Sequence, residues 1–111
     1  MAKGTHLGEL EELALLAVLG LGQDAHGGTV RDELERRADR TVSISTVYVT
    51  LLRLEEKGYA RSHLGEPGEK RGGKAKRLYE VSPAGVAALE AARDVRERLW
   101  TAVEGRRAHA R

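Results

Sequence analysis

The sequence predicts a mainly α-helical domain that carries a small β-hairpin and ends in a long helix. The segment from Ser43 to Gly58 has a helix start signal, one apolar stripe, a small polar face and a glycine stop. A glycine- and lysine-rich segment follows, and residues 82–105 then repeat apolar side chains at intervals of three and four. A polar-faced helix followed by a cationic hairpin is the order of a winged helix-turn-helix. In that fold the helix enters the major groove of DNA and the hairpin holds the backbone.

Composition limits the size and surroundings of this fold. The chain has 111 residues, 41% of them hydrophobic, which supports one compact unit. Within it we expect a DNA-binding part over residues 1–81 and a C-terminal helix with a basic tail over residues 82–111. There is no Phe, so Leu, Val and Ala must supply most of the core, and there is no Cys for disulfides or metal sites. No apolar run reaches the roughly 18 residues of a membrane span, and no secretory signal is apparent, so we expect a cytoplasmic protein.

The distribution of charge is more informative than the net charge of +2. Residues 1–59 carry seven basic and ten acidic side chains, whereas residues 60–81 carry six basic and three acidic ones. Five basic residues fall within eight positions with no acid among them: Lys70, Arg71, Lys74, Lys76 and Arg77. Such a patch is typical of contacts with phosphates, although a loop made cationic for solubility has the same composition.

Two helices are expected before the polar-faced one. The first, over residues 9–21, is apolar nearly all round and should therefore be central and buried on several sides. Residues 23–28 form a turn. The second helix is expected over residues 29–38, capped by Thr29. Its single apolar stripe places it at the surface and consists of Val30, Leu34 and Ala38.

The third helix is the candidate recognition helix, and either Ser43 or Ser45 can cap it. A buried stripe with i, i+4, i+7 spacing is formed by Val47, Leu51 and Leu54, and Ile44 and Leu52 widen it. The opposite side shows small or hydrogen-bonding groups and one arginine rather than a mixture of Glu and Lys. These residues are Ser45, Thr46, Val49, Thr50 and Arg53.

The hairpin and the last helix complete the expected fold. Residues 59–63 and 77–81 read as strands, with a glycine-rich tip between them. Ser82 as N-cap and Pro83 at the first helical position open a helix that runs to about Gly105. About 23 residues span roughly 35 Å, more than so small a core can cover, so we expect the same helix of a second chain to cover the rest. The expected homodimer interface is Leu89, Ala92, Val95, Leu99, Trp100 and Val103.

These segments together resemble the PadR family of bacterial transcriptional regulators, in its short form with one C-terminal dimerisation helix. The resemblance covers about residues 7–104. His26-Gly27 resembles the family's His-Gly at the turn into the second helix, residues 43–58 its recognition-helix signature, and residues 77–85 its second wing strand with the entry to the dimerisation helix. The resemblance implies a homodimeric repressor that binds a palindromic operator, often near its own promoter, and is commonly released by an effector.

Three positions depart from the family pattern. Gly28 stands where an aromatic residue is usual, Ser45 where glycine is common, and Val49 where proline is common. The last two lie on the expected reading surface. They therefore affect which operator is recognised and leave the expected fold unchanged.

The expected partner is double-stranded DNA, contacted by the third helix and the hairpin. Hydroxyl groups can bond phosphates or base edges, and arginine can bond guanine. Ser45 and Thr46 have capping as an alternative role, Tyr48 has core packing, and Arg53 has a phosphate contact or an ion pair with Glu56. The expected contact residues are Ser43, Ser45, Thr46, Tyr48, Thr50, Arg53, Lys70, Arg71, Lys74, Lys76 and Arg77.

Other functions find less support in the sequence. Trp100 can form the floor of a site for a flat small-molecule effector, although packing in the dimer interface is the favoured role. The four His residues lack metal-ligand spacing, and no nucleophile or phosphate-cradling motif is present, so no cofactor, metal or enzymatic activity is expected. The alternative function is a winged-helix protein-interaction module without sequence-specific DNA binding, which would have no need of a basic hairpin tip.

Overall fold

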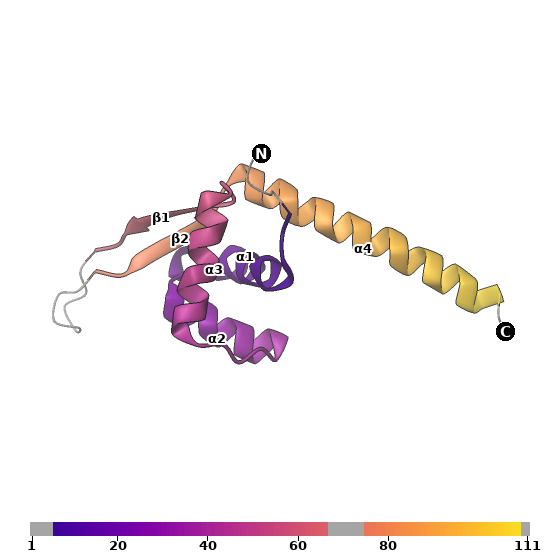
Figure 1. The fold of residues 1–111 in the computed structure, drawn as a ribbon, viewed down its shortest axis with the longest axis horizontal. Coiled ribbons are helices and arrows are strands. Elements are labelled where there is room, and N and C mark those ends of the chain that lie inside the picture. The colour runs from indigo at the N-terminus through magenta and orange to yellow at the C-terminus, as the bar shows by residue number, and fades with distance from the viewer. Residues whose placement is uncertain (1–5, 67–74, 110–111) are drawn as a thin grey trace.

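The computed structural model describes residues 6–66 and 75–109. The first three helices pack together, the hairpin extends from one side of this body, and the last helix leaves on the other side (Figure 1). This confirms the predicted winged helix-turn-helix with a long C-terminal helix. The elements are α1 (Glu9–Leu21), a 3-10 turn η1 (Gly22–Asp24), α2 (Gly27–Ala38), α3 (Ile44–Glu56), β1 (Ala60–Leu64), β2 (Arg77–Val81) and α4 (Pro83–His109).

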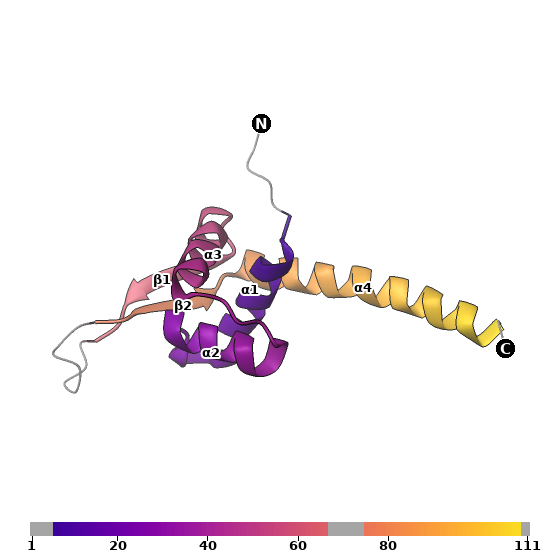
Figure 2. The same cartoon turned by 60° about the horizontal axis from the view of Figure 1, so that its bottom comes forward.

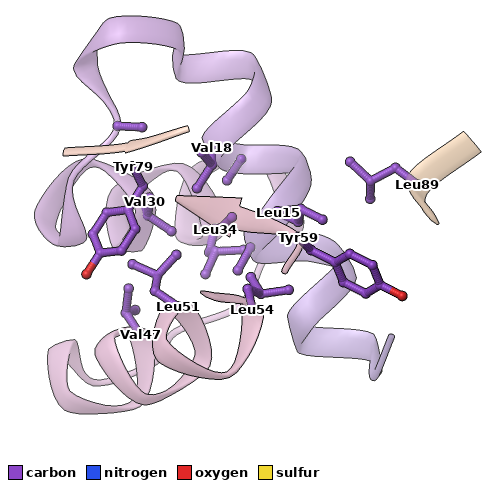
Figure 3. Packing of buried hydrophobic residues seen from close by; sticks show 14 residues of the cluster. Leu15, Val18, Val30, Leu34, Val47, Leu51, Leu54, Tyr59, Tyr79 and Leu89 are labelled. Carbon is purple, nitrogen blue, oxygen red and sulfur yellow. The ribbon is translucent and has the colours of Figure 1, made fainter. Parts of the chain in front are cut away.

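One apolar cluster holds the helices and the hairpin together (Figure 3). Burying a side chain of this size stabilises the fold by about 1.5–3 kcal/mol, so the three central helices are fixed firmly against one another. Tyr59, Tyr79 and Leu89 join the cluster from the hairpin and α4. The largest fully buried side chains are Leu15, Val18, Val30, Val47, Leu51 and Leu54.

Helix α1 has the predicted bounds, and one of its apolar faces is left open. The helix is buried on several sides as predicted, but Leu16 and Leu19 are 46% and 48% exposed, so its apolar surface is not covered all round. The reason is that α2, α3 and the hairpin cover the opposite side of α1 and leave this side open. That covered side buries Ala14, Leu15, Ala17 and Val18.

Helix α2 begins two residues earlier than predicted because a histidine caps it. The Nδ1 atom of His26 accepts a hydrogen bond from the Gly28 amide at 3.2 Å. Thr29, predicted as the cap, instead lies inside the first turn, where its Oγ1 accepts from the His26 amide at 3.0 Å. The two side chains thus satisfy each other's backbone groups, as in a capping box.

Helix α3 has a serine at its start and a glycine after its end. Of the two candidate caps, Ser43 takes this position, and its Oγ accepts from the Thr46 amide at 3.1 Å. Gly58 follows the helix with a φ of 80°, a left-handed conformation that favours glycine. The predicted glycine stop is therefore confirmed.

The hairpin is a two-stranded antiparallel sheet in which Ala60 lies opposite Val81 and Leu64 opposite Arg77. Strand β2 has the predicted bounds, and β1 begins one residue later than predicted. Most of the predicted glycine-rich tip, residues 67–74, lies outside the described residues.

Helix α4 starts in close contact with the body and then leaves it. Ser82 Oγ accepts from the Gly85 amide at 3.0 Å, which confirms the predicted cap. A Cβ atom on Gly85 would overlap the carbonyl oxygen of Tyr59, so this approach needs a glycine. The helix continues to His109, four residues further than predicted, and its residues from Arg93 to His109 are all exposed. Among the described helices, none has both the length and the apolar character to cross a membrane.

The first turn of α1 connects three separate parts of the body through carboxylates. Each carboxylate pairs with a cation from another segment: the loop before α3, the residue after α3, and the middle of α4. The pairs are Glu9 Oε1 with Arg40 Nη1 at 2.6 Å, Glu11 Oε1 with Lys57 Nζ at 2.7 Å, and Glu12 Oε1 with Arg96 Nη2 at 2.6 Å. We call these three glutamates the acidic turn.

Candidate nucleic-acid interface

The outer face of α3 is the first part of the candidate interface. All its members are exposed, and α3 lies beside the hairpin in both views of the fold (Figures 1 and 2). We define this outer face as Ser45, Thr46, Tyr48, Val49, Leu52 and Arg53.

Three hydroxyl groups gather where α3 begins. Ser43 Oγ lies 2.9 Å from Thr46 Oγ1 and 3.1 Å from Ser45 Oγ. The same Ser43 oxygen caps the helix, so Ser43 has a structural role already. Ser45 and Thr46 present their exposed hydroxyls next to it, where they can bond a phosphate or a base edge.

Two residues of α3 lie on the opposite side from that predicted. Thr50 is only 6% exposed, and its Oγ1 donates to the Thr46 carbonyl at 2.8 Å, so the expectation that it lies on the exposed polar face is wrong. Leu52, expected to widen the buried stripe, is 55% exposed. The core lies toward Val47 and Leu54, which brings Thr50 inside and turns Leu52 outward.

Tyr48 is held by the start of α2, as expected for a ring that packs on the second helix. A Cβ atom on Gly27 would lie 2.6 Å from Cζ and 2.7 Å from the hydroxyl oxygen of this ring. Glycine at position 27 therefore gives the ring its space. Because the Tyr48 side chain remains half exposed, it is also available to DNA.

Arg53 lies late in α3 and is exposed. No ion pair forms between the described side chains of Arg53 and Glu56, one of the alternatives that the sequence left open. Its charge acts instead on Glu11 of the acidic turn. Burial alone raises the pKa of Glu11, but hydrogen bonds from Lys57 and from the Gly8 amide, together with the Lys57 and Arg53 charges, lower it overall.

The end of the hairpin strands nearest the tip supplies the described part of the basic patch. Arg77 Nη1 donates to Ser62 Oγ at 3.0 Å, and Ser62 Oγ donates to Glu55 Oε2 at 2.7 Å, so this arginine is tied to the end of α3. Lys76 lies beside the start of α2, with its Nζ 3.3 Å from His26 Nε2. The other predicted hairpin contacts lie outside the described residues: Lys70, Arg71 and Lys74.

His26 is the residue of this region that sequence reasoning left out of the contact set. In the sequence analysis His26 enters only as part of the His-Gly pair at the turn into the second helix. In the structure it caps α2 by accepting a hydrogen bond from the Gly28 amide, and its ring also lies beside Lys76. The only available signal was the His-Gly pair itself, because His26 and Lys76 are 50 positions apart.

The far half of α4 exposes large apolar side chains among its charged ones. Val95, Leu99, Trp100 and Val103 are 47%, 64%, 60% and 43% exposed, and we call them the apolar stripe of α4. A groove of about 530 Å³ beside it extends toward the N-terminal segment and is lined in part by Leu7, Tyr59, Ala88, Ala92, Val95 and Leu99.

Leu89 does not belong to that exposed stripe. It is only 6% exposed because it packs into the core of its own chain. Its assignment to the dimer interface is therefore wrong, since little of its surface is left for a partner. Among the described residues, no group of three His, Asp or Glu side chains comes together to hold a metal ion.

Three helices pack together, and the third exposes its outer face beside a basic hairpin. This arrangement defines the class of winged helix-turn-helix regulators. The model of the transcriptional regulator PadR-like family matches residues 15–91. The chain therefore belongs to the PadR-like family and is a transcriptional regulator, not an enzyme.

Individual relatives agree with this assignment. Transcriptional regulator Rv3488 of Mycobacterium tuberculosis is 40% identical over 88 residues, which span 78% of this chain and 76% of the relative. A PadR-like transcriptional regulator from Bacillus cereus has a similar fold, with a TM-score of 0.68 at 20% identity over 86% of this chain and 88% of that one. Bacillus subtilis PadR, solved in complex with operator DNA, has a TM-score of 0.60 at 18% identity, over 74% of this chain and 46% of that one.

Proposed function

We propose that this regulator is a homodimeric repressor that acts in the cytoplasm and binds a palindromic operator through α3 and the hairpin. The observation that carries the proposal is the outer face of α3 beside Lys76 and Arg77. Hydroxyls, a tyrosine and an arginine are suited to the floor and rim of a major groove, and the two cations are suited to its phosphates. The complex of Bacillus subtilis PadR with operator DNA supports this use of the fold.

The apolar stripe of α4 supports the homodimer. Four large or medium apolar side chains exposed on one helix form an interaction surface rather than a hydrated one. A second copy presents the same stripe and can cover it in a symmetric pair. The helix of 27 residues is about 40 Å long, which suits a connection between two readers set one turn of DNA, about 34 Å, apart.

Trp100 supports a more limited proposal, that a planar small molecule releases the DNA. Its indole is exposed in the single chain and would lie at the junction of two α4 helices. Planar compounds should quench Trp100 fluorescence if they stack on the indole. If a broad set of compounds leaves the emission unchanged, Trp100 serves only in packing.

The first experiment is a salt titration of DNA binding by fluorescence anisotropy. One duplex carries the DNA upstream of the protein's own gene, and the other is a scrambled sequence of equal length. We expect tighter binding to the first, with log K falling by about 0.9 per neutralised phosphate for each unit of log salt on both. Equal affinity for both duplexes would place the operator elsewhere. Binding to neither at low salt would contradict the proposal and favour a protein-interaction module.

A further inference from the structure

Two apolar side chains lie in the middle of the outer face of α3. Val49 and Leu52 are 49% and 55% exposed. The buried stripe of the same helix points the other way, into the core (Figure 3), and consists of Val47, Leu51 and Leu54. Residues three positions apart are neighbours on a helix surface, so Val49 and Leu52 form one small apolar patch that faces away from the protein.

Hydrogen-bonding groups flank this patch along the helix. Ser45 lies about one turn before Val49 and Arg53 about one turn after it, and both are exposed. On the side toward the start of α1, Val49 borders an open hollow of about 520 Å³. A base edge that approaches the outer face therefore meets a hydroxyl, then an apolar group, then a guanidinium.

The major groove offers one apolar group to such a patch, the C5-methyl group of thymine. The other groups that bases present there are hydrogen-bond donors and acceptors, which would lose water against Val49 and gain no partner in exchange. Thymine carries its methyl group next to the O4 acceptor. The Ser45 hydroxyl can therefore donate to the same base whose methyl group packs on Val49.

We propose that Val49, with Leu52 beside it, packs against the C5-methyl group of one thymine in each half-site of the operator. The proposal rests on the proposed function and deepens it, because it names the base at one operator position. It assigns discrimination between sequences to an apolar contact. The cations of the hairpin, Lys76 and Arg77, supply affinity that does not depend on sequence.

Replacing thymine by uracil in the operator duplex tests this contact, because uracil keeps O4 and the base pair and lacks only the methyl group. The operator duplex is the upstream duplex or, should that bind no better than the scrambled one, the tightest duplex selected from a random pool. By fluorescence anisotropy, the wild type should bind the uracil duplex about 15-fold more weakly, at about 4-fold for each methyl contact in two half-sites. The scrambled duplex should show little change, since non-specific binding depends on phosphates.

Val49→Ser removes the apolar group and leaves a side chain of similar helix propensity. Because Val49 is exposed, this variant should melt like the wild type in circular dichroism. It should bind the thymine and uracil duplexes with nearly equal affinity. The matched control is Lys76→Gln, which should weaken binding to both duplexes by the same factor and keep the preference for thymine.

Equal affinity of the wild type for the thymine and uracil operator duplexes would overturn the proposal, and so would a folded Val49→Ser protein that keeps the wild-type preference. Replacing one thymine at a time should confine the loss to one symmetry-related position in each half-site. A loss spread evenly along the duplex would indicate an effect of the methyl groups on DNA shape and would also overturn the contact. Failure of the wild type to bind any duplex is a different result, because it overturns the proposed function itself.

Discussion

Helix α3 is covered on one side by the core along its length, whereas the core covers only the start of α4, and the two helices also differ in what they leave uncovered. The uncovered side of α3 carries hydroxyls, a tyrosine and an arginine among two apolar residues, and it lies beside cations. The uncovered side of α4 beyond Arg93 carries the apolar stripe and lies beside an apolar groove. The first chemistry suits a hydrated, anionic partner and the second suits another apolar surface, so two partners can be assigned to two faces of one small body.

The largest expected effect comes from placing charge on the apolar stripe of α4. Leu99→Glu with Val103→Glu should leave the chain folded but monomeric, because two carboxylates cannot be buried unpaired in an interface. Without the second reader, operator affinity should fall by about 10²–10⁴. Light scattering coupled to size exclusion, followed by anisotropy, measures both. Thr101→Glu is the control, since Thr101 lies about 200° around the helix from Leu99. A double variant that stays dimeric would contradict the assignment of the apolar stripe of α4 to the dimer interface.

The next effect contrasts two neighbouring leucines of α3. Leu51 is fully buried, so Leu51→Ala should lower the free energy of unfolding by about 2–5 kcal/mol in urea denaturation. Leu52 is exposed, so Leu52→Ala should change it by no more than about 0.5 kcal/mol. Equal losses from both substitutions would show that the outer face of α3 is not an open surface.

Two glycines test how each helix approaches its neighbour. Gly85→Ala should lower the free energy of unfolding by about 1–3 kcal/mol, because the added Cβ meets the backbone carbonyl of Tyr59. Gly27→Ala meets a side chain, the Tyr48 ring, which can turn away, so its loss should be smaller. In thermal melts, Gly85→Ala should be the less stable of the two variants. Gly27→Ala should in addition weaken DNA binding. The reverse ranking would mean that Tyr48 is clamped as firmly as the backbone.

The smallest effect concerns Glu11, which joins α1 to the end of α3 through Lys57. Its pKa in the folded state is lowered from the ordinary value of 4.5. A lowered pKa contributes stability above pH 4.5 that is lost as the pH falls through the folded value. Glu11→Gln should therefore be less stable than the wild type at pH 7, by below about 1 kcal/mol, and the gap should narrow at pH 3. Urea midpoints at both pH values measure it, and a constant gap would contradict the ionic contribution.

Much of the fold could be predicted from periodicity and from start and stop residues. The bounds of α1 and β2 were correct, and Ser82, Gly58 and the order of elements were read correctly. The start of α2 was missed because an imidazole nitrogen, not a hydroxyl, caps it. The end of α4 was missed because Gly105 has open space around it, and an exposed helix can continue through a glycine without a clash.

The site was predicted less completely, because the apolar stripe of one helix does not define how much of that helix the neighbouring elements cover. For this reason Thr50 is buried where an exposed position was predicted, and Leu52 is exposed where a buried one was predicted. Leu89, predicted in the dimer interface, lies in the core. The pairing of His26 with Lys76 depends on a hydrogen bond between the turn before α2 and strand β2. A local sequence pattern cannot predict a contact between residues 50 positions apart.

The contact between Arg96 and the acidic turn divides α4 into a part fixed to the body and a part that projects from it. Among the described residues, Arg96 is the last one of α4 to hydrogen-bond the body, and the seventeen residues 93–109 are all exposed. The projecting part carries Leu99, Trp100 and Val103 of the apolar stripe, so the length of helix before Leu99 sets how far from the body a second copy would bind. Inserting whole helical turns between Arg96 and Leu99, about 5.4 Å each, would move this part of the stripe outward and offers a route to engineered regulators for operators of other lengths, with the reading body left as it is.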